Sequence, residues 1–327
     1  MRFKKILAAF AAAVMAVSAV TVTAFADSKG VKISEKNFPD EVFRGYVSDN
    51  FDTDKNGYLS KEERKAVTEI SVGINWEGYR WDNPVESLKG VEYFTRLKKI
   101  DCTEGNLTSI DVSKNTRLTH LLCRGSVFTE LDVSKNTKLK QLECDRADHF
   151  GRGGIKRLDV SNNTKLEYLS CSGNDIEELD LSNNAKLEYL CCGGNYIEEL
   201  DVSKNTKLKV LACSFCKLKK LDVSKNTELE RLVCNGNKLK KLDLKNNTEL
   251  VELWCFENRI KSLDLSSCAK LESLHCSDNK LTELDVSGCP KLDELNCYRN
   301  DITELKINIA RSITVIKCDD NVKIIEP

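Results

Sequence analysis

From residue 97 onward the chain repeats one pattern of apolar and polar positions. Two half-repeats alternate, one of ten residues, such as 229–238 (LERLVCNGNK), and one of eleven, such as 218–228 (LKKLDVSKNTE). In each half, two leucines and a cysteine or valine point inward, and the alternation around them is typical of a short strand. Each pair of halves makes one repeat unit, and the regular succession of these units predicts a solenoid of stacked coils.

Cysteines mark the register of these coils. They recur once in each repeat unit, at a constant spacing except for one longer step between Cys144 and Cys171. This ladder comprises Cys102, Cys123, Cys144, Cys171, Cys192, Cys213, Cys234, Cys255, Cys276, Cys297 and Cys318. We interpret them as small apolar core side chains with mostly free thiols, because in-register parallel strands fit disulfide geometry poorly. A metal site at Cys213 and Cys216 is disfavoured, because both occupy inward positions without a second pair or a histidine.

Asparagines follow the strands in both halves, where a side-chain amide can satisfy backbone groups that a tight coil would bury unpaired. One ladder comprises Asn115, Asn136, Asn163, Asn184, Asn205, Asn226 and Asn247, and the other Asn174, Asn195, Asn237, Asn258, Asn279, Asn300 and Asn321. Cys216, Cys268 and Cys289 stand at asparagine positions. With LxxLxLxxN in each half, residues 97–321 resemble the leucine-rich repeats of exported bacterial proteins of the internalin-like class, in which ten- and eleven-residue halves alternate.

This resemblance implies a β-rich solenoid: a right-handed leucine-rich repeat stack of about ten coils of short parallel strands. It further implies recognition of other proteins, adhesin-like, at a bacterial surface. Because each coil contacts only its neighbours, both ends need caps. We expect the N-terminal cap in residues 71–96, and the solenoid in 97–327, with its C-terminal cap in the irregular repeat after Ile302.

Residues 1–26 have the pattern of an export signal. Three basic side chains precede an apolar run, and Ala24-Phe25-Ala26 forms a small-x-small cleavage site. We expect cleavage after Ala26 and a protein that is secreted or held at the cell surface. It is not expected to be an integral membrane protein, because no later apolar run is long enough to span a bilayer.

Charge excludes one class of partner. Removing the signal segment takes away three positive charges and changes the formal net charge from −1 to −4. This is nearly neutral for a chain in which 31% of the residues are charged, so we expect no nucleic-acid partner.

Residues 52–63 carry regularly spaced oxygen donors. Gly57 permits a sharp turn, and the candidate ligands are Asp52, Asp54, Asn56, the Tyr58 carbonyl, Ser60 and Glu63. Hard oxygen ligands at this spacing match the twelve-residue EF-hand loop. Helices expected after Pro39-Asp40 and from Lys61 to Val67 flank it. We therefore predict a segment over 27–70 that binds Ca²⁺ with modest affinity and stiffens the cap; an acidic surface loop is the alternative.

Large side chains vary at outward positions beside the cysteine ladder, where the scaffold elsewhere uses Lys, Glu and Ser. Contiguous exposed aromatic area is typical of interfaces. The candidates are Tyr168, Tyr189, Arg231, Trp254, Phe256, His275 and Tyr298, which we expect to share one exposed stripe. An insertion around 74–84 adds Trp76 and Trp81, and a further insertion lies near 149–154. Tolerated surface aromatics are the alternative.

Aspartates also recur, at outward positions of the eleven-residue halves. They are Asp111, Asp132, Asp159, Asp180, Asp201, Asp222, Asp243, Asp264 and Asp285, usually with a serine two residues on. Because stacked carboxylates repel, we expect each to bond to nearby hydroxyl or amide groups. A cation-binding ladder is the alternative.

Catalysis has little support in the sequence. Its three histidines, His120, His149 and His275, are spread over distant coils, and no common catalytic motif occurs. We therefore predict a non-enzymatic module that binds a protein ligand. A carbohydrate-binding module, whose aromatic rings stack on sugars, and a passive surface spacer are the alternatives.

Overall fold

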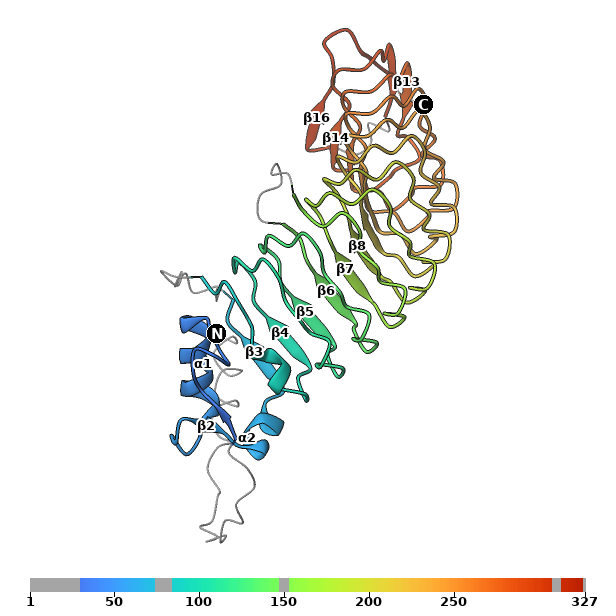
Figure 1. Cartoon of the computed structure of the whole chain (residues 1–327). Coiled ribbons are helices and arrows are strands. Elements are labelled where there is room, and N and C mark those ends of the chain that lie inside the picture. Colours follow the sequence, from blue (N-terminus) through green and yellow to red (C-terminus); the bar gives the residue numbers. More distant parts are fainter. Residues whose placement is uncertain (1–29, 74–83, 147–152, 308–312, 326–327) are drawn as a thin grey trace, which may run out of the picture.

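The structure is a computed structural model that describes residues 30–73, 84–146, 153–307 and 313–325. These residues form a solenoid of about ten coils with a small helical segment at its N-terminal end (Figure 1). The expected export signal lies outside the described residues, as do Trp76, Trp81 and most of the insertion near 149–154.

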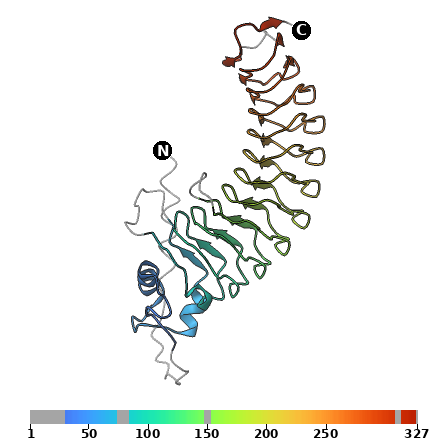
Figure 2. The same ribbon diagram turned by 45° about the horizontal axis from the view of Figure 1, so that its top comes forward.

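The ten-residue halves supply eleven strands of one twelve-stranded parallel sheet that runs the length of the solenoid, and β3, which precedes the repeats, supplies the twelfth. The coils curve, and this sheet lies on the inner side of the curve (Figure 2). Each strand has three residues and pairs in register, so that Leu232 lies opposite Leu211 and Leu253. The strands are β3 (Glu69–Ser71), β4 (Lys99–Asp101), β5 (His120–Leu122), β6 (Gln141–Glu143), β7 (Tyr168–Ser170), β8 (Tyr189–Cys191), β9 (Val210–Ala212), β10 (Arg231–Val233), β11 (Glu252–Trp254), β12 (Ser273–His275), β14 (Glu294–Asn296) and β16 (Val315–Lys317).

The eleven-residue halves form regular strands only near the C-terminus. There β13 (Glu283–Asp285), β15 (Glu304–Lys306) and β17 (Lys323–Ile325) make a three-stranded sheet. In the earlier coils, the asparagine ladder bridges neighbours instead. The amide of Asn136, for example, donates to the carbonyls of Val112 and Asn115, both at 3.0 Å. The prediction of a strand in every half-repeat is therefore confirmed for the ten-residue halves. For the eleven-residue halves it holds only near the C-terminus.

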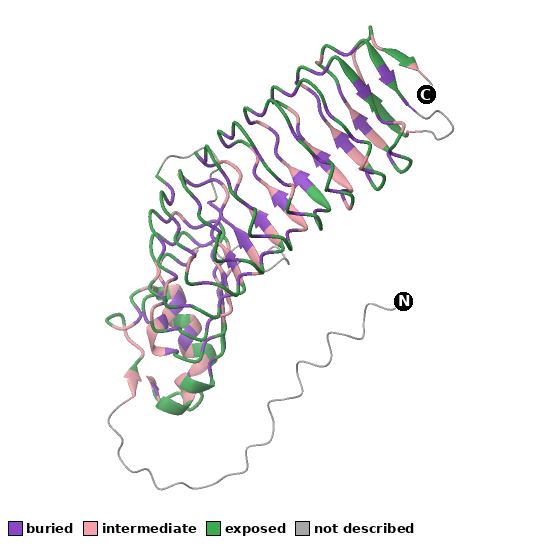
Figure 3. Ribbon diagram, turned by 90° about the vertical axis from the view of Figure 1, so that its right-hand side faces the viewer, coloured by how far each residue is buried: buried purple, intermediate pink, exposed green. Residues whose placement is uncertain are grey.

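One continuous apolar core fills the coils, from Phe38 to Ile307 (Figure 3). All fifteen cysteines are free in the structure, where the sequence predicts mostly free thiols. Burial raises the pKa of the ladder thiols, that of Cys255 to about 12, so these thiols stay neutral. Cys216, which stands at an asparagine position, makes the same kind of contact with the neighbouring coil: its thiol lies 3.4 Å from the carbonyl of Cys192.

The helical segment packs directly on the first coil and shares its core. The expected helices are present as α1 (Glu41–Phe51) and α2 (Lys61–Ala66), while β1 (Val31–Lys32), β2 (Tyr58–Leu59) and the 3₁₀ turn η1 (Val91–Tyr93) complete this end. Phe43 and Val47 of α1 are fully buried, and the ring of Phe51 lies 5.3 Å from that of Phe94. Strand β3 follows α2 closely and crosses the expected boundary at residue 70, so that the segment is itself part of the cap.

Asp40 fastens α1 to the solenoid. One of its carboxylate oxygens caps the helix by accepting from the N–H of Phe43 at 2.8 Å. The other accepts from the N–H groups of Glu86 and Ser87, at 2.8 and 3.0 Å. A further hydrogen bond joins β3 to α1, because the N–H of Ser71 donates to the Tyr46 hydroxyl at 3.2 Å.

The C-terminal end is less well covered. Ile316 of β16 and Ile324 of β17 occupy inward positions, yet they are 39% and 48% exposed. The irregular repeat after Ile302 therefore does not seal the core within the described residues.

Each aspartate of the recurring row accepts a hydrogen bond from the backbone N–H two residues on, which supports the structural interpretation. Asp201 accepts from Ser203 at 2.8 Å, and the other eight do the same. Hydrogen bonds from the Ser203 backbone and side chain lower the pKa of Asp201, and the same kind of bond lowers the pKa of each of the others.

These bonds predict a loss of stability in acid. A carboxyl whose pKa is lower in the folded than in the unfolded chain stabilises the fold when the pH is above its unfolded pKa of about 3.9. This stabilisation is lost as the pH falls through the folded pKa. The urea midpoint should therefore drop below about pH 4. Asn at positions 180, 201 and 222 keeps an acceptor oxygen but cannot titrate, so the triple variant should lose less stability in acid; an equal loss would contradict this account.

Candidate functional site

Three carboxylates converge in the loop between α1 and α2. One oxygen from each of Asp52, Asp54 and Glu63 lies within 4.8 Å of the others. Asp52 directly follows α1 and is only 3% exposed, so burial fixes one side of the cluster. The remaining predicted ligands, Asn56, Ser60 and the Tyr58 carbonyl, belong to the same loop.

Hydrogen bonds within the loop set its shape. The Asp52 carboxylate accepts from the N–H of Gly57 at 2.9 Å. The Asn56 side-chain oxygen accepts from the N–H of Tyr58 at 2.7 Å, and its amide donates to Asp54 at 2.7 Å. Gly57 has a φ of 79°, a left-handed conformation in which glycine has no steric cost. These bonds hold Asp52, Asp54 and Asn56 close together within the loop.

Glu63 has two structural partners. Its Oε2 accepts from the N–H of Ser60 at 2.8 Å, while Ser60 Oγ accepts from the N–H of Glu63 at 3.1 Å, which is a capping box at the start of α2. Its Oε1 accepts from the N–H and hydroxyl of Thr53, both at 2.7 Å. Burial acts to raise the pKa of Glu63, but the bonds from Thr53 and Ser60 outweigh it and hold that pKa below its usual value. Glu63 is therefore an anion at neutral pH.

The predicted partner-binding residues occupy three columns along the long sheet rather than one stripe. Tyr168, Tyr189 and Arg231 begin their strands, whereas Trp254 and His275 end theirs. Phe256 and Tyr298 lie two residues beyond the ends of β11 and β14, at the edge of the sheet. The in-register coils bring residues of the same column together.

Two stacked ring pairs result from this register. Tyr168 and Tyr189 stack with centroids 4.1 Å apart and planes 3° from parallel. Trp254 and His275 stack at 5.3 Å and 28°. His275 Nε2 lies 3.1 Å from a carboxylate oxygen of Glu294.

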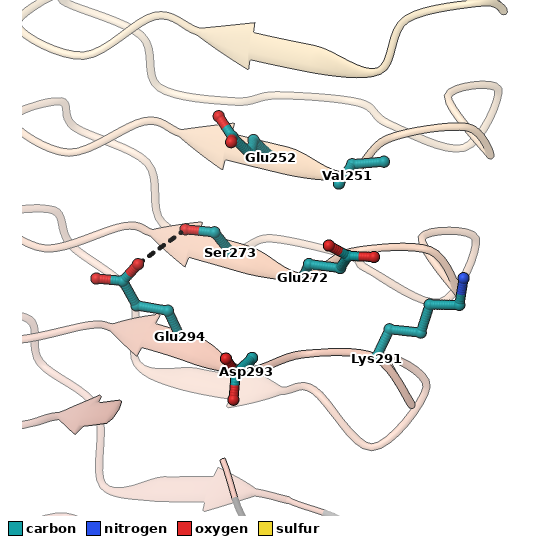
Figure 4. Close-up of a pocket in the computed structure, with 7 residues that line it drawn as sticks. All are labelled: Val251, Glu252, Glu272, Ser273, Lys291, Asp293 and Glu294. Carbon is teal, nitrogen blue, oxygen red and sulfur yellow. Dashed lines mark hydrogen bonds between the residues drawn. The ribbon is translucent and has the colours of Figure 1, made fainter. Parts of the chain in front are cut away.

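A hollow of about 370 Å³ lies at the start of β11, β12 and β14 (Figure 4), whereas Trp254 and His275 end β11 and β12. It is lined by Val251, Glu252, Glu272, Ser273, Lys291, Asp293 and Glu294. The Ser273 hydroxyl donates to Glu294 at 3.4 Å, and Arg231 Nε lies 2.6 Å from Glu252. Although Glu252 is paired with Arg231, the other three carboxylates face one lysine, so this part of the sheet is acidic.

Two exposed aromatics were not predicted. Phe215 is 57% exposed and has a φ of 51°, although bulky residues rarely adopt this conformation. Its ring covers Gly236, where a Cβ would come within 2.3 Å of it. Tyr196 is 40% exposed, with Lys217 Nζ 4.4 Å from its ring centroid. The sequence does carry one signal for Phe215: it stands where several other coils have a glycine, such as Gly236.

Replacement of Phe215 by glycine should barely change the free energy of unfolding. Glycine relieves a left-handed conformation that costs other residues about 1 kcal/mol, which offsets the lost ring contacts. Alanine loses the same contacts but keeps the conformational cost, so it should be less stable than glycine by about 1 kcal/mol. Urea unfolding of both variants measures this difference. An alanine variant as stable as the glycine variant would show that the backbone there is not strained.

Residues with other chemistry lie apart in the structure. His120 and His275 belong to β5 and β12, with β6 to β11 between them in the sheet, and His149 is outside the described residues. Cys191 at the end of β8 is half-buried, and its thiol lies 3.0 Å from the Ser172 hydroxyl. In the described part of the chain, every helix is too short or too polar to cross a bilayer.

Comparisons with known proteins agree with the coil pattern. The family described as leucine-rich repeats (two copies) matches residues 248–285 and 269–307. The functional domain of InlJ from Listeria monocytogenes, which includes a cysteine ladder, is 34% identical with a TM-score of 0.82. The alignment covers 90% of this chain and 64% of that one, so this chain spans less than two thirds of the InlJ domain. No curated protein matches the sequence.

More distant structures share the fold. An internalin, inlF of L. monocytogenes, has a TM-score of 0.55 at 21% identity, covering 89% of this chain and 97% of its own. A leucine-rich repeat protein of Leptospira interrogans has a TM-score of 0.62 at 16% identity, covering 83% and 77%. The chain is thus a leucine-rich repeat protein with internalin-like neighbours in Listeria. Solenoids of this kind are typically non-enzymatic modules for binding and recognition.

Proposed function

We propose that this chain is an exported, calcium-binding leucine-rich repeat protein that recognises a protein partner, adhesin-like, through its long sheet. The contact region would be the acidic aromatic face, which we define as Glu252, Trp254, Phe256, Glu272, His275, Asp293, Glu294 and Tyr298. The observation that carries this proposal is the occurrence, on the same strands, of the acidic hollow and the stacked Trp254–His275 pair.

Aromatic anchors beside a recess are the features that dominate binding energy at protein interfaces. A passive spacer would not need Tyr298 at 47% exposure within the same few coils. A glycan ligand would also use aromatic rings. However, the four carboxylates of the hollow favour a partner with basic side chains, because complementary charge speeds association and excludes wrong partners.

Capture from the native surroundings tests the partner proposal. The intact protein is immobilised, and the bound fraction is analysed for protein; in parallel the protein is applied to a glycan array. We expect a specific protein that is released by salt. A glycan hit without a captured protein would replace the proposal with a carbohydrate-binding one, and no ligand in either assay would favour the spacer.

The calcium proposal rests on the loop over 52–63. Asp52, Asp54 and Glu63 supply three carboxylates, and Asn56, Ser60 and the Tyr58 carbonyl complete an oxygen-rich set of the kind that Ca²⁺ prefers. Because the loop is continuous with α1, which is tied to the first coil through Asp40, bound calcium would stiffen the cap. Calorimetric titration of the intact protein with calcium should give one site, and no heat of binding would refute this.

Export is supported by the sequence over 1–26, with its basic start, apolar run and cleavage site. The mature N-terminus should be Asp27, which N-terminal sequencing of protein from the culture medium or cell surface would test. An intact Met1 in that fraction would contradict processing at this place.

A further inference from the structure

The short strand β1 lies against the candidate calcium loop. It pairs antiparallel with β2, with Val31 opposite Leu59 and Lys32 opposite Tyr58. The N–H of Ile33 also donates to the carbonyl of Gly57 at 3.0 Å. Residues 30–33, which we call the N-terminal clamp, thus contact three consecutive residues of the loop.

The N-terminal clamp approaches the backbone of the loop very closely at Gly30. A Cβ on Gly30 would come within 2.3 Å of the Leu59 carbonyl oxygen and 2.8 Å of its carbon, both of them backbone atoms that cannot swing away. Only glycine allows the chain to approach the loop this closely. Leu59 itself is fully buried, so the loop cannot retreat into the core to make room.

The clamp holds the part of the loop that supplies a main-chain ligand. Tyr58 is the seventh residue of the twelve, and its carbonyl is the predicted ligand at that position. Unlike a carboxylate, which can rotate toward an ion, a carbonyl is oriented only by its own backbone. Pairing of Lys32 with Tyr58 and of Val31 with Leu59 restrains this backbone on one side, while Asp52 and Glu63 hold the loop at its ends.

We propose that the N-terminal clamp is a positioning element for calcium: it fixes the Tyr58 carbonyl and makes this single loop a complete site without a second loop. This inference rests on the calcium function proposed above. By linkage, a clamp that strengthens calcium binding must in turn be held more firmly when calcium is bound.

The first test compares two glycine-to-alanine variants of the full chain by calcium calorimetry. Gly30→Ala places a methyl group against Leu59 and should raise the dissociation constant at least about tenfold. Gly45→Ala is the control. It lies in α1 of the same segment, its Cβ would meet nothing within 4 Å, and it should leave the constant unchanged.

The outcomes separate the two proposals. If the wild-type protein binds no calcium, the calcium function itself fails. If wild type and Gly30→Ala bind equally well, the calcium function stands and the clamp is overturned.

A second measurement needs no variant and covers the case in which Gly30→Ala fails to fold. Amide hydrogen exchange of the wild-type protein is followed at Val31, Ile33 and Leu59, with calcium and with a chelator. We expect slower exchange with calcium at all three. Equal rates at Val31 and Ile33, in a protein that calorimetry shows to be saturated, would contradict the coupling.

Discussion

Alanine at both Trp254 and Phe256 should weaken capture of the protein partner by at least about 100-fold, because aromatic anchors at an interface each contribute about 2 kcal/mol or more. The change removes the indole that stacks on His275 and the ring at the adjoining edge of the sheet. The measurement is the dissociation constant of the captured partner, once purified, for wild type and variant. Most of the loss should appear as faster dissociation, as is usual for changes within one interface.

The matched control for this double variant lies on the other side of the coils. Lys204 and Lys225 are exposed in eleven-residue halves, away from the long sheet. Their double replacement by alanine should leave the affinity within about twofold, since surface changes remote from an interface have small effects. Circular dichroism and thermal unfolding show whether each variant keeps its fold. A folded Trp254/Phe256 variant with unchanged affinity would remove the acidic aromatic face from consideration.

Replacement of Glu63 by glutamine should lower calcium affinity on the order of 100-fold or more, because the loop loses the carboxylate that would bind the ion through both oxygens. The substitution is informative because Glu63 also caps α2, and glutamine serves equally well in a capping box. Because an amide has one acceptor oxygen, the variant loses the bonds from either Thr53 or Ser60, and thermal unfolding in chelator should show a modest loss of stability. The stabilisation that calcium adds to the wild-type protein should disappear altogether.

The adjacent Glu62 provides the control. It is exposed in the first turn of α2, and Glu62→Gln makes the same change of charge one residue away from the proposed ligand. Calcium affinity should then change by less than about threefold, since exposed charges act weakly through water. Equal losses for Glu62→Gln and Glu63→Gln would indicate a general electrostatic effect and not direct coordination.

Strict periodicity explains why the stack itself could be predicted from the sequence. Because Leu211, Leu232 and Leu253 recur once in each repeat unit at constant spacing, register followed directly, and the free thiols followed from their inward positions. The periodicity did not reveal which halves would form regular strands. That depends on the spacing between coils, and an asparagine amide such as that of Asn136 can bridge neighbours where no strand ladder forms.

The candidate sites divide in the same way. Oxygen donors at 52–63 were visible because their spacing is local, whereas β1 was missed because two residues, Val31 and Lys32, carry no periodic signal. The aromatic positions were predicted to point outward, but a single stripe was too simple. Spacing from the cysteine ladder placed Tyr168 and Trp254 on the same face, yet they begin and end their strands and so lie in different columns.

Because the register is uniform, the length of the solenoid can change in steps of one whole repeat unit. Since neighbouring coils present the same contacts, one whole repeat unit between Cys192 and Cys255 could be removed or duplicated with the interfaces on either side rejoined. Each such event would shift the acidic aromatic face relative to the cap by one strand spacing, about 4.8 Å. Gain or loss of repeat units during evolution could therefore change the distance between the cap and the acidic aromatic face. The chemistry of that face and the core of the solenoid would stay the same.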